Sequence, residues 1–242
     1  MRCCLLLSIL CALPLHLAAA SPLADARSSV VRLRAVQADG TASFGSAVVV
    51  GPEQLATACH VTRAARSIEV FHGTQRWVVQ RQAGSVEHDL CVLSVTGLNL
   101  PPVRTRASTA LQPHEPVVAI GHPGGGELVV NEGRVEGLYD YDGARVIRTS
   151  AAFDFGASGG GLFDQAGNLV GLLAFKSKRG ERLGFALPLD WLANGARVAA
   201  RLAPVDATPT SVAFWERDKA EQPAFLHAAI VEATSERQPY RR

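Results

Sequence analysis

Residues Phe153–Phe163 read FDFGASGGGLF, with a serine at position 158 set among glycines before the chain returns to apolar residues. The centre of this stretch, Gly156–Gly160, also fits the G-x-S-x-G pattern of a nucleophile elbow. Turns rich in glycine and serine are common in β proteins, so the stretch alone is compatible with a nucleophile and with a flexible turn. Residues elsewhere in the chain decide between these two interpretations.

The composition is that of a folded, nearly neutral protein. Of 242 residues, 48% are hydrophobic and 19% are charged, which is enough apolar material for one large domain or two small ones. The formal net charge is only +2, and we interpret Arg241 and Arg242 as a solvated terminus, so we expect no nucleic-acid partner. The sequence has no H-E-x-x-H motif and no paired C-x-x-C, so we expect no metal site and no cofactor.

Residues 1–20, MRCCLLLSILCALPLHLAAA, have the layout of a secretory signal peptide. Arg2 supplies the positive end, a leucine-rich stretch follows, and Ala18–Ala20 forms an A-x-A cleavage signal. A membrane anchor would need roughly 18 or more apolar residues without the interruptions at Pro14 and His16. We therefore predict an exported protein, periplasmic or secreted, with no membrane span once the signal is removed.

Short apolar, β-branched runs separated by Gly, Pro, Asp and Asn dominate the rest of the chain. Such spacing is typical of a β-barrel or a β-sandwich. The middle of the chain lacks the alternation of strands and long helical patterns that a parallel α/β sheet would require, so we predict an all-β fold. The expected strands are 30–36, 46–50, 67–71, 77–79, 90–95, 116–120, 128–130, 145–147 and 169–175.

Proline and polar residues near 98–113 interrupt this strand pattern. They divide the mature chain into two comparable halves. We predict an N-terminal domain over 21–105 and a second domain over 106–203.

One convincing helical pattern lies at the end of the second domain. Leu189–Leu202 places its apolar residues on a broad stripe, and Pro204 ends the pattern. We expect the tail, 204–242, to be partly disordered or to contain a second helix within 214–233.

A serine hydroxyl is a poor nucleophile at neutral pH unless a base accepts its proton and a carboxylate holds that base in the right tautomer. The sequence offers both groups. His60, in LATACHV, stands where an apolar run ends, and Asp89, in HDLCVLSV, stands just before a strongly apolar run. Both positions are suited to the mouth of a strand, so we predict that His60, Asp89 and Ser158 form a catalytic triad.

Chain order separates two families of hydrolase. An α/β-hydrolase presents Ser, then Asp or Glu, then His, whereas this chain presents His60, Asp89 and Ser158 in that order. The only histidine after Ser158 is His227, which lies in the polar tail. The order excludes the nucleophile-elbow interpretation.

The chain resembles a trypsin-like serine protease of the chymotrypsin fold, in particular the protease domain of the HtrA (Deg) group. The matching pieces follow the family's order and cover most of Gly45–Pro188. They are GSAVVVGPEQLATACHV around His60, HDLCVLSV around Asp89, AIGHPGG at Ala119–Gly125, TSAAFDFGASGGGLFDQAGNLVGLLAF around Ser158, and LGFALP at Leu183–Pro188. The resemblance implies two six-stranded antiparallel β-barrels with the active site in the cleft between them.

The resemblance also implies a role for each residue of the triad. His60 would act as general base and then as general acid, Asp89 would orient it, and Ser158 would form an acyl-enzyme with a polypeptide substrate. The backbone amides of Gly156 and Ser158 would form the oxyanion hole.

The family pattern maps residues 174–176 onto the strand that pairs with the substrate backbone, which is recognition by β-strand addition. Residues 152–155 and the segment around Gly184 would line the pocket for the side chain before the scissile bond. Family members that cut after Lys or Arg carry an Asp where this chain has Ala152, so we predict a preference for small to medium apolar residues. The predicted substrate-binding residues are Ala152, Ala174, Phe175, Lys176 and Gly184.

Several positions depart from the family pattern. Asp154 and Phe155 replace a typical Asn-Pro, and Gly161 replaces the usual proline after Ser-Gly-Gly. These changes leave open a second function, a peptide-binding or chaperone-like protein whose oxyanion loop is collapsed. Little more than fifty residues follow Pro188, too few for the PDZ domain of roughly 90 residues that most of this group carry, so we do not assume activation through PDZ-driven oligomers.

Removal of the signal leaves two cysteines, Cys59 and Cys91. They lie beside His60 and near Asp89, whose side chains must meet, so a single disulfide can form in an oxidising compartment. Two small buried thiols are an interpretation that is at least as good. His88 directly precedes Asp89 and would point the other way on an extended chain, so we interpret it as a surface residue.

Overall fold

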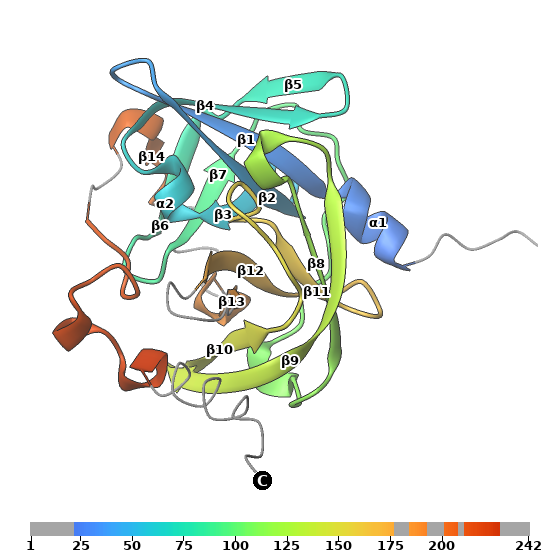
Figure 1. Ribbon diagram of the computed structural model, residues 1–242. Helices are drawn as coiled ribbons and strands as arrows, with labels where there is room; N and C mark the ends of the chain where they lie inside the picture. Colours follow the sequence, from blue (N-terminus) through green and yellow to red (C-terminus); the bar gives the residue numbers. More distant parts are fainter. Residues whose placement is uncertain (1–21, 177–183, 193–200, 208–210, 228–242) are drawn as a thin grey trace, which may run out of the picture.

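The computed structural model describes residues 22–176, 184–192, 201–207 and 211–227. These residues form two β units that lie one above the other (Figure 1). Residues 1–20, where we predict a signal peptide, lie outside the described residues. Within the described part of the chain, no helix is long and apolar enough to cross a membrane.

The first unit is a curled sheet of eight strands in the order β14-β6-β7-β3-β2-β1-β4-β5. Alternate side chains of a strand point to opposite faces, and on β1 this periodicity buries Val31, Leu33 and Ala35 inside the curl. The strands are β1 (Val30–Gln37), β2 (Ala42–Gly51), β3 (Gln54–Ala58), β4 (Ala65–His72), β5 (Gln75–Val78), β6 (Arg81–Ser85), β7 (Leu90–Ser94) and β14 (Ala203–Pro204).

The second unit is a closed antiparallel barrel in the strand order β10-β13-β12-β11-β8-β9. Its interior is filled by buried side chains that include Val117, Ile147, Leu162 and Leu173. The strands are β8 (Pro116–Gly121), β9 (Val129–Tyr141), β10 (Ala144–Thr149), β11 (Gly161–Asp164), β12 (Leu169–Lys176) and β13 (Gly184–Pro188).

The helices are short, and most of them serve as connections. Two named α-helices and five 3-10 helices lie within the described residues, and further α-helical residues begin at Ala224. The named helices are α1 (Pro22–Ser28), α2 (Cys59–Thr62), η1 (Ser108–Ala110), η2 (Pro123–Gly125), η3 (Leu189–Leu192), η4 (Val205–Ala207) and η5 (Lys219–Glu221).

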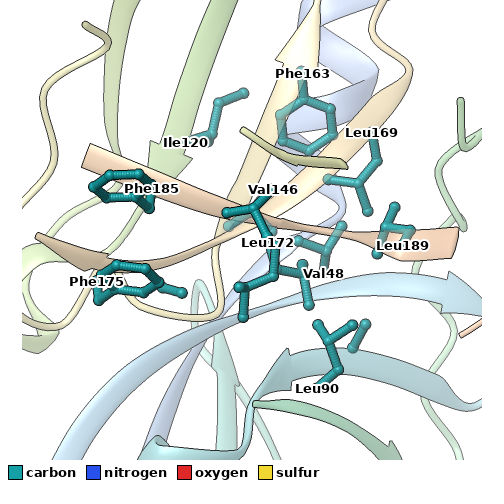
Figure 2. Close-up of a cluster of buried hydrophobic side chains, with 14 of the residues drawn as sticks. Val48, Leu90, Ile120, Val146, Phe163, Leu169, Leu172, Phe175, Phe185 and Leu189 are labelled. Carbon is teal, nitrogen blue, oxygen red and sulfur yellow. The ribbon is translucent and has the colours of Figure 1, made fainter. Parts of the chain in front are cut away.

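A hydrophobic core joins the two units. Val48 of β2 and Leu90 of β7 pack in one cluster with Leu172 of β12, and all three are fully buried (Figure 2). Phe175 and Phe185 of the barrel belong to the same cluster, with their rings stacked at a centroid distance of 4.8 Å. Burial of this much apolar surface fixes the two units against each other, so the seam between them has a defined shape.

The predicted all-β, two-unit fold is confirmed, and the second unit is the expected six-stranded barrel. The first unit differs from the expected six-stranded barrel. It is a curled, open sheet of eight strands with β14 and β5 at its two edges. Each strand run named from the sequence falls on an observed strand. The predicted runs do not include β3, β6, β11, β13 and β14, which are short and contain Ala, Gly, Gln, Asp or Pro instead of a β-branched run.

The end of the chain differs more from expectation. A 3-10 helix begins at Leu189 as the helical stripe predicts, but residues 193–200 lie outside the described residues. The chain then returns to the first unit, where Ala203 of β14 pairs with Gln82 of β6. Between 214 and 223 the chain forms turns and the short helix η5, and α-helical residues begin only at Ala224.

Cys59 and Cys91 form a disulfide, with their Cα atoms 5.0 Å apart. Both residues are buried, at the start of α2 and within β7. The bond therefore takes the place of the two separate thiols that the sequence also allowed. It closes a loop with a sequence separation of 32 residues, which limits the conformations of the unfolded chain.

We expect the double substitution Cys59→Ala/Cys91→Ala to lower the free energy of unfolding by about 2–4 kcal/mol, because the unfolded chain regains the freedom of this loop. Urea unfolding of the oxidised protein, the reduced protein and the double variant measures the effect. Equal unfolding midpoints for the oxidised and reduced proteins would show that the bond contributes nothing.

Candidate active site

His60 and Asp89 come from the ends of two neighbouring strands. β3 pairs with β7 so that Ala58 lies opposite Leu90, which brings the residues just beyond each end together. His60 is the second residue of α2, and Asp89 immediately precedes β7. The backbone of Asp89 is left-handed, with φ of 57°, a conformation that Asp adopts more readily than most residues.

The carboxylate of Asp89 is held by His60 through two separate hydrogen bonds. Oδ1 accepts from the backbone N–H of His60 at 2.8 Å, and Oδ2 lies 2.7 Å from the ring Nδ1. The carboxylate is 1% exposed, whereas the His60 side chain remains 20% exposed. This arrangement favours the tautomer with a proton on Nδ1 and leaves Nε2 as an acceptor.

The loop that carries Ser158 belongs to the barrel but is fastened to the first unit. Ser46 of β2 donates its hydroxyl to the carbonyl of Gly156 at 2.9 Å and its backbone N–H to the carbonyl of Ser158 at 2.8 Å. The carbonyl of Phe155 accepts from Gly124 N–H at 2.6 Å. These bonds direct the carbonyls of the loop toward the protein.

The backbone N–H groups of Gly156 and Ser158 differ from these carbonyls in their hydrogen bonding. Within the described residues, neither the N–H of Gly156 nor that of Ser158 donates a hydrogen bond to the chain. The Phe155 carbonyl points to Gly124, and the groups of a trans peptide point in opposite directions, so the Gly156 N–H points away from Gly124. The described chain therefore leaves two backbone donors of the serine loop unengaged.

The backbone of this loop needs glycine at two positions. Gly156 has φ of 90° and Gly159 has φ of 81°, both in the left-handed region. A Cβ on Gly159 would also overlap the carbonyl oxygen of Ser46 and the hydroxyl of Thr57. The glycines therefore allow the loop to turn and to approach the first unit closely.

The hydroxyl of Ser158 donates to the carbonyl of Ala174 at 3.0 Å. No hydrogen bond joins Ser158 to His60 in the described part of the chain. A series of contacts nevertheless links β12 to His60. Phe175, the neighbour of Ala174, stacks on the ring of Trp215, and this ring lies edge-on to His60. The serine hydroxyl is thus turned toward β12.

The predicted substrate-binding residues lie on β12, on β13 and before the serine loop. Ala174 and Phe175 are buried in β12, and Lys176 at its end pairs in register with Gly184 of β13. A Cβ on Gly184 would contact the ring of Phe153, so this glycine leaves room for an aromatic side chain.

The other side of this region is formed by residues 152–155. Ala152 is exposed, and its carbonyl accepts from Asn131 at 2.8 Å. Asp154 forms an ion pair with Lys176, and the ammonium group of Lys176 lies 5.6 Å from the ring centre of the exposed Phe155. The acidic group nearest this region is thus already paired with a cation.

Trp215 is part of this site and was missed by sequence reasoning. Its indole N–H donates to Oδ2 of Asp89 at 3.2 Å, and its ring lies edge-on to His60 at a centroid distance of 5.4 Å. Its ring also stacks on Phe175, at a centroid distance of 4.7 Å. The only available signal was the aromatic pair Phe214-Trp215 in a polar tail.

The surface interpretation of His88 is wrong. Its side chain is 17% exposed, and Nε2 lies 2.7 Å from a carboxylate oxygen of Asp142 on the barrel side. Its ring also packs on Trp191 at a centroid distance of 4.4 Å. The residue is directed toward the second unit because the backbone turns at Asp89 and is not extended there.

Arg63 and Glu216 form a bidentate ion pair beside the site. The two oxygens of Glu216 accept from the two terminal nitrogens of Arg63 at 2.7 and 2.8 Å. Burial by itself would raise the pKa of Glu216, but the hydrogen bonds from Arg63 and from the Ala213 N–H outweigh it and lower the pKa. The hydrogen bond to Glu216 in turn raises the pKa of Arg63.

No cluster of three or more His, Cys, Asp or Glu side chains suited to a metal ion occurs among the residues that the structure describes. The chemistry available at the seam is that of a buried carboxylate, an imidazole, a hydroxyl and backbone amides.

The two β units, with a His–Asp pair on one and a serine loop on the other, define a chymotrypsin-like β protein. The family model described as "Trypsin-like peptidase domain" matches residues 45–172, just over half of the chain. The chain belongs to the trypsin-like peptidase family.

Relatives and solved structures extend this result. A "Probable periplasmic serine endoprotease DegP-like" of Hahella chejuensis is 34% identical over 157 residues, which are 61% of this chain and 34% of that protein. The HtrA-type protease AlgW with a tripeptide is 32% identical, with a TM-score of 0.64 over 70% of this chain and 59% of that one. The matched region spans about a third of the length of that curated relative.

A further solved structure supports the fold alone. The active form of the Rv3671c protease from M. tuberculosis has a TM-score of 0.68 at 23% identity. The alignment covers 79% of this chain and 88% of that one.

We expect Glu216→Gln to lower the free energy of unfolding at pH 7 by about 1 kcal/mol, because the half-buried Arg63 loses its charged partner. The folded-state pKa of Glu216 lies below its unfolded value of 4.5, so the stabilisation is present above pH 4.5 and is lost as pH falls through the folded-state pKa. Denaturant unfolding at a series of pH values from 7 into strong acid should show a gap between wild type and variant that shrinks as the pH falls.

The same substitution at Glu87 is the control. Its carboxylate is 54% exposed and pairs with Arg217 at 3.0 Å. We expect Glu87→Gln to change stability by less than about 0.5 kcal/mol. Equal losses for both variants, or a Glu216 gap that does not shrink as the pH falls, would contradict the assignment.

Proposed function

We propose that the protein is a serine endopeptidase in which His60, Asp89 and Ser158 act as the catalytic triad. The observation that carries this proposal is the buried His60–Asp89 pair at the seam where the two unengaged amides flank Ser158. Membership of the trypsin-like peptidase family supports it.

The first step is attack of the Ser158 oxygen on the carbonyl carbon of a peptide bond. Nε2 of His60 accepts the hydroxyl proton as the new C–O bond forms, and Asp89 stabilises the resulting imidazolium. The hydroxyl must first exchange its bond to the Ala174 carbonyl for one to His60, and such bonds are often loose in the free enzyme.

The electrons of the carbonyl double bond move onto oxygen in this step. The N–H groups of Gly156 and Ser158 stabilise that oxyanion, and each such donor contributes about a hundred- to a thousandfold in rate in comparable sites. The imidazolium then gives its proton to the leaving amine, the C–N bond breaks and an acyl-enzyme remains. Water attacks the ester by the same route in reverse and restores Ser158.

The substrate backbone is proposed to pair with β12 at Ala174–Lys176, where the sheet ends at the site. The residue before the scissile bond would enter the space near Ala152 and Gly184. Ala152 carries no charge, and Asp154 is engaged by Lys176, so this space offers no unpaired carboxylate to a basic side chain. We therefore keep the assignment of a small to medium apolar preference.

Export is part of the same proposal. Residues 1–20 have the layout of a signal peptide, and the Hahella chejuensis relative is named as periplasmic. The disulfide between Cys59 and Cys91 suits an oxidising compartment outside the cytoplasm.

One observation favours a second candidate function, a peptide-binding protein without turnover. The Ser158 hydroxyl donates its hydrogen bond to the backbone carbonyl of Ala174 and not to His60. If this bond were permanent, the fold would present a peptide groove without an activated nucleophile.

An aryl phosphonate probe distinguishes the two functions. We expect it to label wild-type protein at Ser158 and to leave Ser158→Ala unlabelled. We further expect Asp89→Asn to cut kcat about 10³- to 10⁴-fold, because His60 loses the acceptor that fixes its tautomer. Folded wild-type protein that stays unlabelled would support the peptide-binding protein.

A peptide library with varied residues before the scissile bond tests the specificity. We expect kcat/KM for Ala, Val or Leu to exceed that for Lys or Arg at least about tenfold, because a buried ammonium or guanidinium would lack a counter-charge. The variant Ala152→Asp, which supplies that charge, should move the preference toward Lys and Arg. Preferred cleavage after basic residues by the wild type would refute the assignment.

A further inference from the structure

The C-terminal segment, defined as residues 211–227, crosses the seam between the two units beside the predicted triad (red in Figure 1). It contacts the first unit through Arg63 and Glu87. It contacts the barrel through Tyr141 and Phe175. A segment that the sequence presents as a tail is therefore packed against both halves of the site.

Phe214 anchors this segment in the shared core. Its side chain is fully buried, and its ring lies 4.8 Å from that of Tyr141 and 6.2 Å from that of Phe175, centre to centre. Leu226, near the other end of the segment, is buried in the same cluster. Because burial of such side chains is strongly favourable, the segment is held in place and does not simply lie on the surface.

Polar contacts fix the backbone on both sides of Trp215. The N–H of Phe214 donates to the carbonyl of Glu87 at 2.9 Å, and the side-chain amide of Gln222 donates to the carbonyl of Trp215 at 2.9 Å. The next residue, Glu216, is held by the bidentate ion pair with Arg63. The indole between these attachments consequently has a defined position.

The indole N–H is aimed at the Asp89 carboxylate, not at solvent or at a backbone carbonyl. Oδ2 of Asp89 accepts from His60 Nδ1 at 2.7 Å and from Trp215 Nε1 at 3.2 Å. The nearby strand β12 offers no side-chain hydrogen-bond donor to Asp89 at position 174, because this residue is an alanine. In the described part of the chain, Trp215 is the one side chain other than His60 that donates to this carboxylate.

We propose that Trp215 is a positioning residue of the peptidase, an inference that rests on the proposed function of the same site. Its N–H holds the buried carboxylate of Asp89 in the plane that suits His60, and its ring keeps the imidazole from turning away from Ser158. Trp215 touches neither the scissile bond nor the nucleophile. It acts only through Asp89 and His60.

Trp215→Phe tests this role, because it keeps an aromatic ring on Phe175 and removes the N–H. We expect kcat of the full-length protein on a peptide substrate to fall about tenfold, which is the value of one hydrogen bond to a charged group, while KM changes less than about twofold. A purely structural change would not separate kcat from KM in this way.

The pH profile gives a second readout. An Oδ2 with one donor fewer carries more negative charge and attracts the positive charge of the imidazolium more strongly. The acidic limb of the kcat/KM profile should therefore move to higher pH in Trp215→Phe. The charged groups nearest the pair, Arg63 and Glu216, are unchanged in the variant, so the movement is assigned to the lost N–H.

Two controls keep the test decisive. Trp77→Phe removes the hydrogen bond from the indole N–H to the Gly97 carbonyl, which lies in the first unit away from the seam. This variant should leave kcat and the pH profile unchanged. Incorporation of 3-benzothienylalanine at position 215 keeps the two-ring shape without the N–H and should reproduce Trp215→Phe, even if that variant folds poorly.

Two results would overturn the inference. One is an unchanged kcat and an unchanged pH profile in correctly folded variants at position 215. The other is a faster enzyme, which would make the segment an inhibitory cover. Failure of phosphonate to label the wild type would instead refute the proposed function, so the two failures are distinguishable.

Discussion

The buried carboxylate of Asp89 is the constraint on which the rest of the site depends. Burial of a charge that is only 1% exposed is costly unless hydrogen-bond donors surround it. The donors to Asp89 are His60 and Trp215, which lies 126 residues after Asp89 in the chain. The Cys59–Cys91 bond and the hydrogen bond from Cys59 N–H to the Asp89 carbonyl fasten the same two strand ends. The carboxylate is satisfied only when the first unit and the C-terminal segment are both in place.

The second constraint is the contact between the two units. The serine loop belongs to the barrel, yet the carbonyls of Gly156 and Ser158 are fixed by Ser46 of the first unit. The direction of the two unengaged amides therefore depends on how the units pack, and Val48 and Leu172 in the shared core help to set that packing. Fold stability and the chemistry proposed for the seam rest on the same contacts.

The sequence predicted what short-range patterns encode. Apolar β-branched runs located most strands, and the interruption near 98–113 divided the chain into two halves. The resemblance to a trypsin-like protease implied a site between them. Short strands such as Gln54–Ala58 carry no such run, because their place is set by pairing with neighbours. Trp215 could not be predicted, since its partner Asp89 is far away in sequence and no periodicity in a polar tail reports a tertiary contact.

The central claim is that an imidazole, an alcohol and two amides converge at this seam to form and stabilise an oxyanion. A crystal structure of the protein treated with an aryl phosphonate tests it most directly. We expect phosphorus bonded to Oγ of Ser158, one phosphonyl oxygen accepting from the N–H groups of Gly156 and Ser158, and Nε2 of His60 within hydrogen-bond distance of the adduct. An adduct whose oxygens face solvent, or density for phosphorus at another residue, would contradict it.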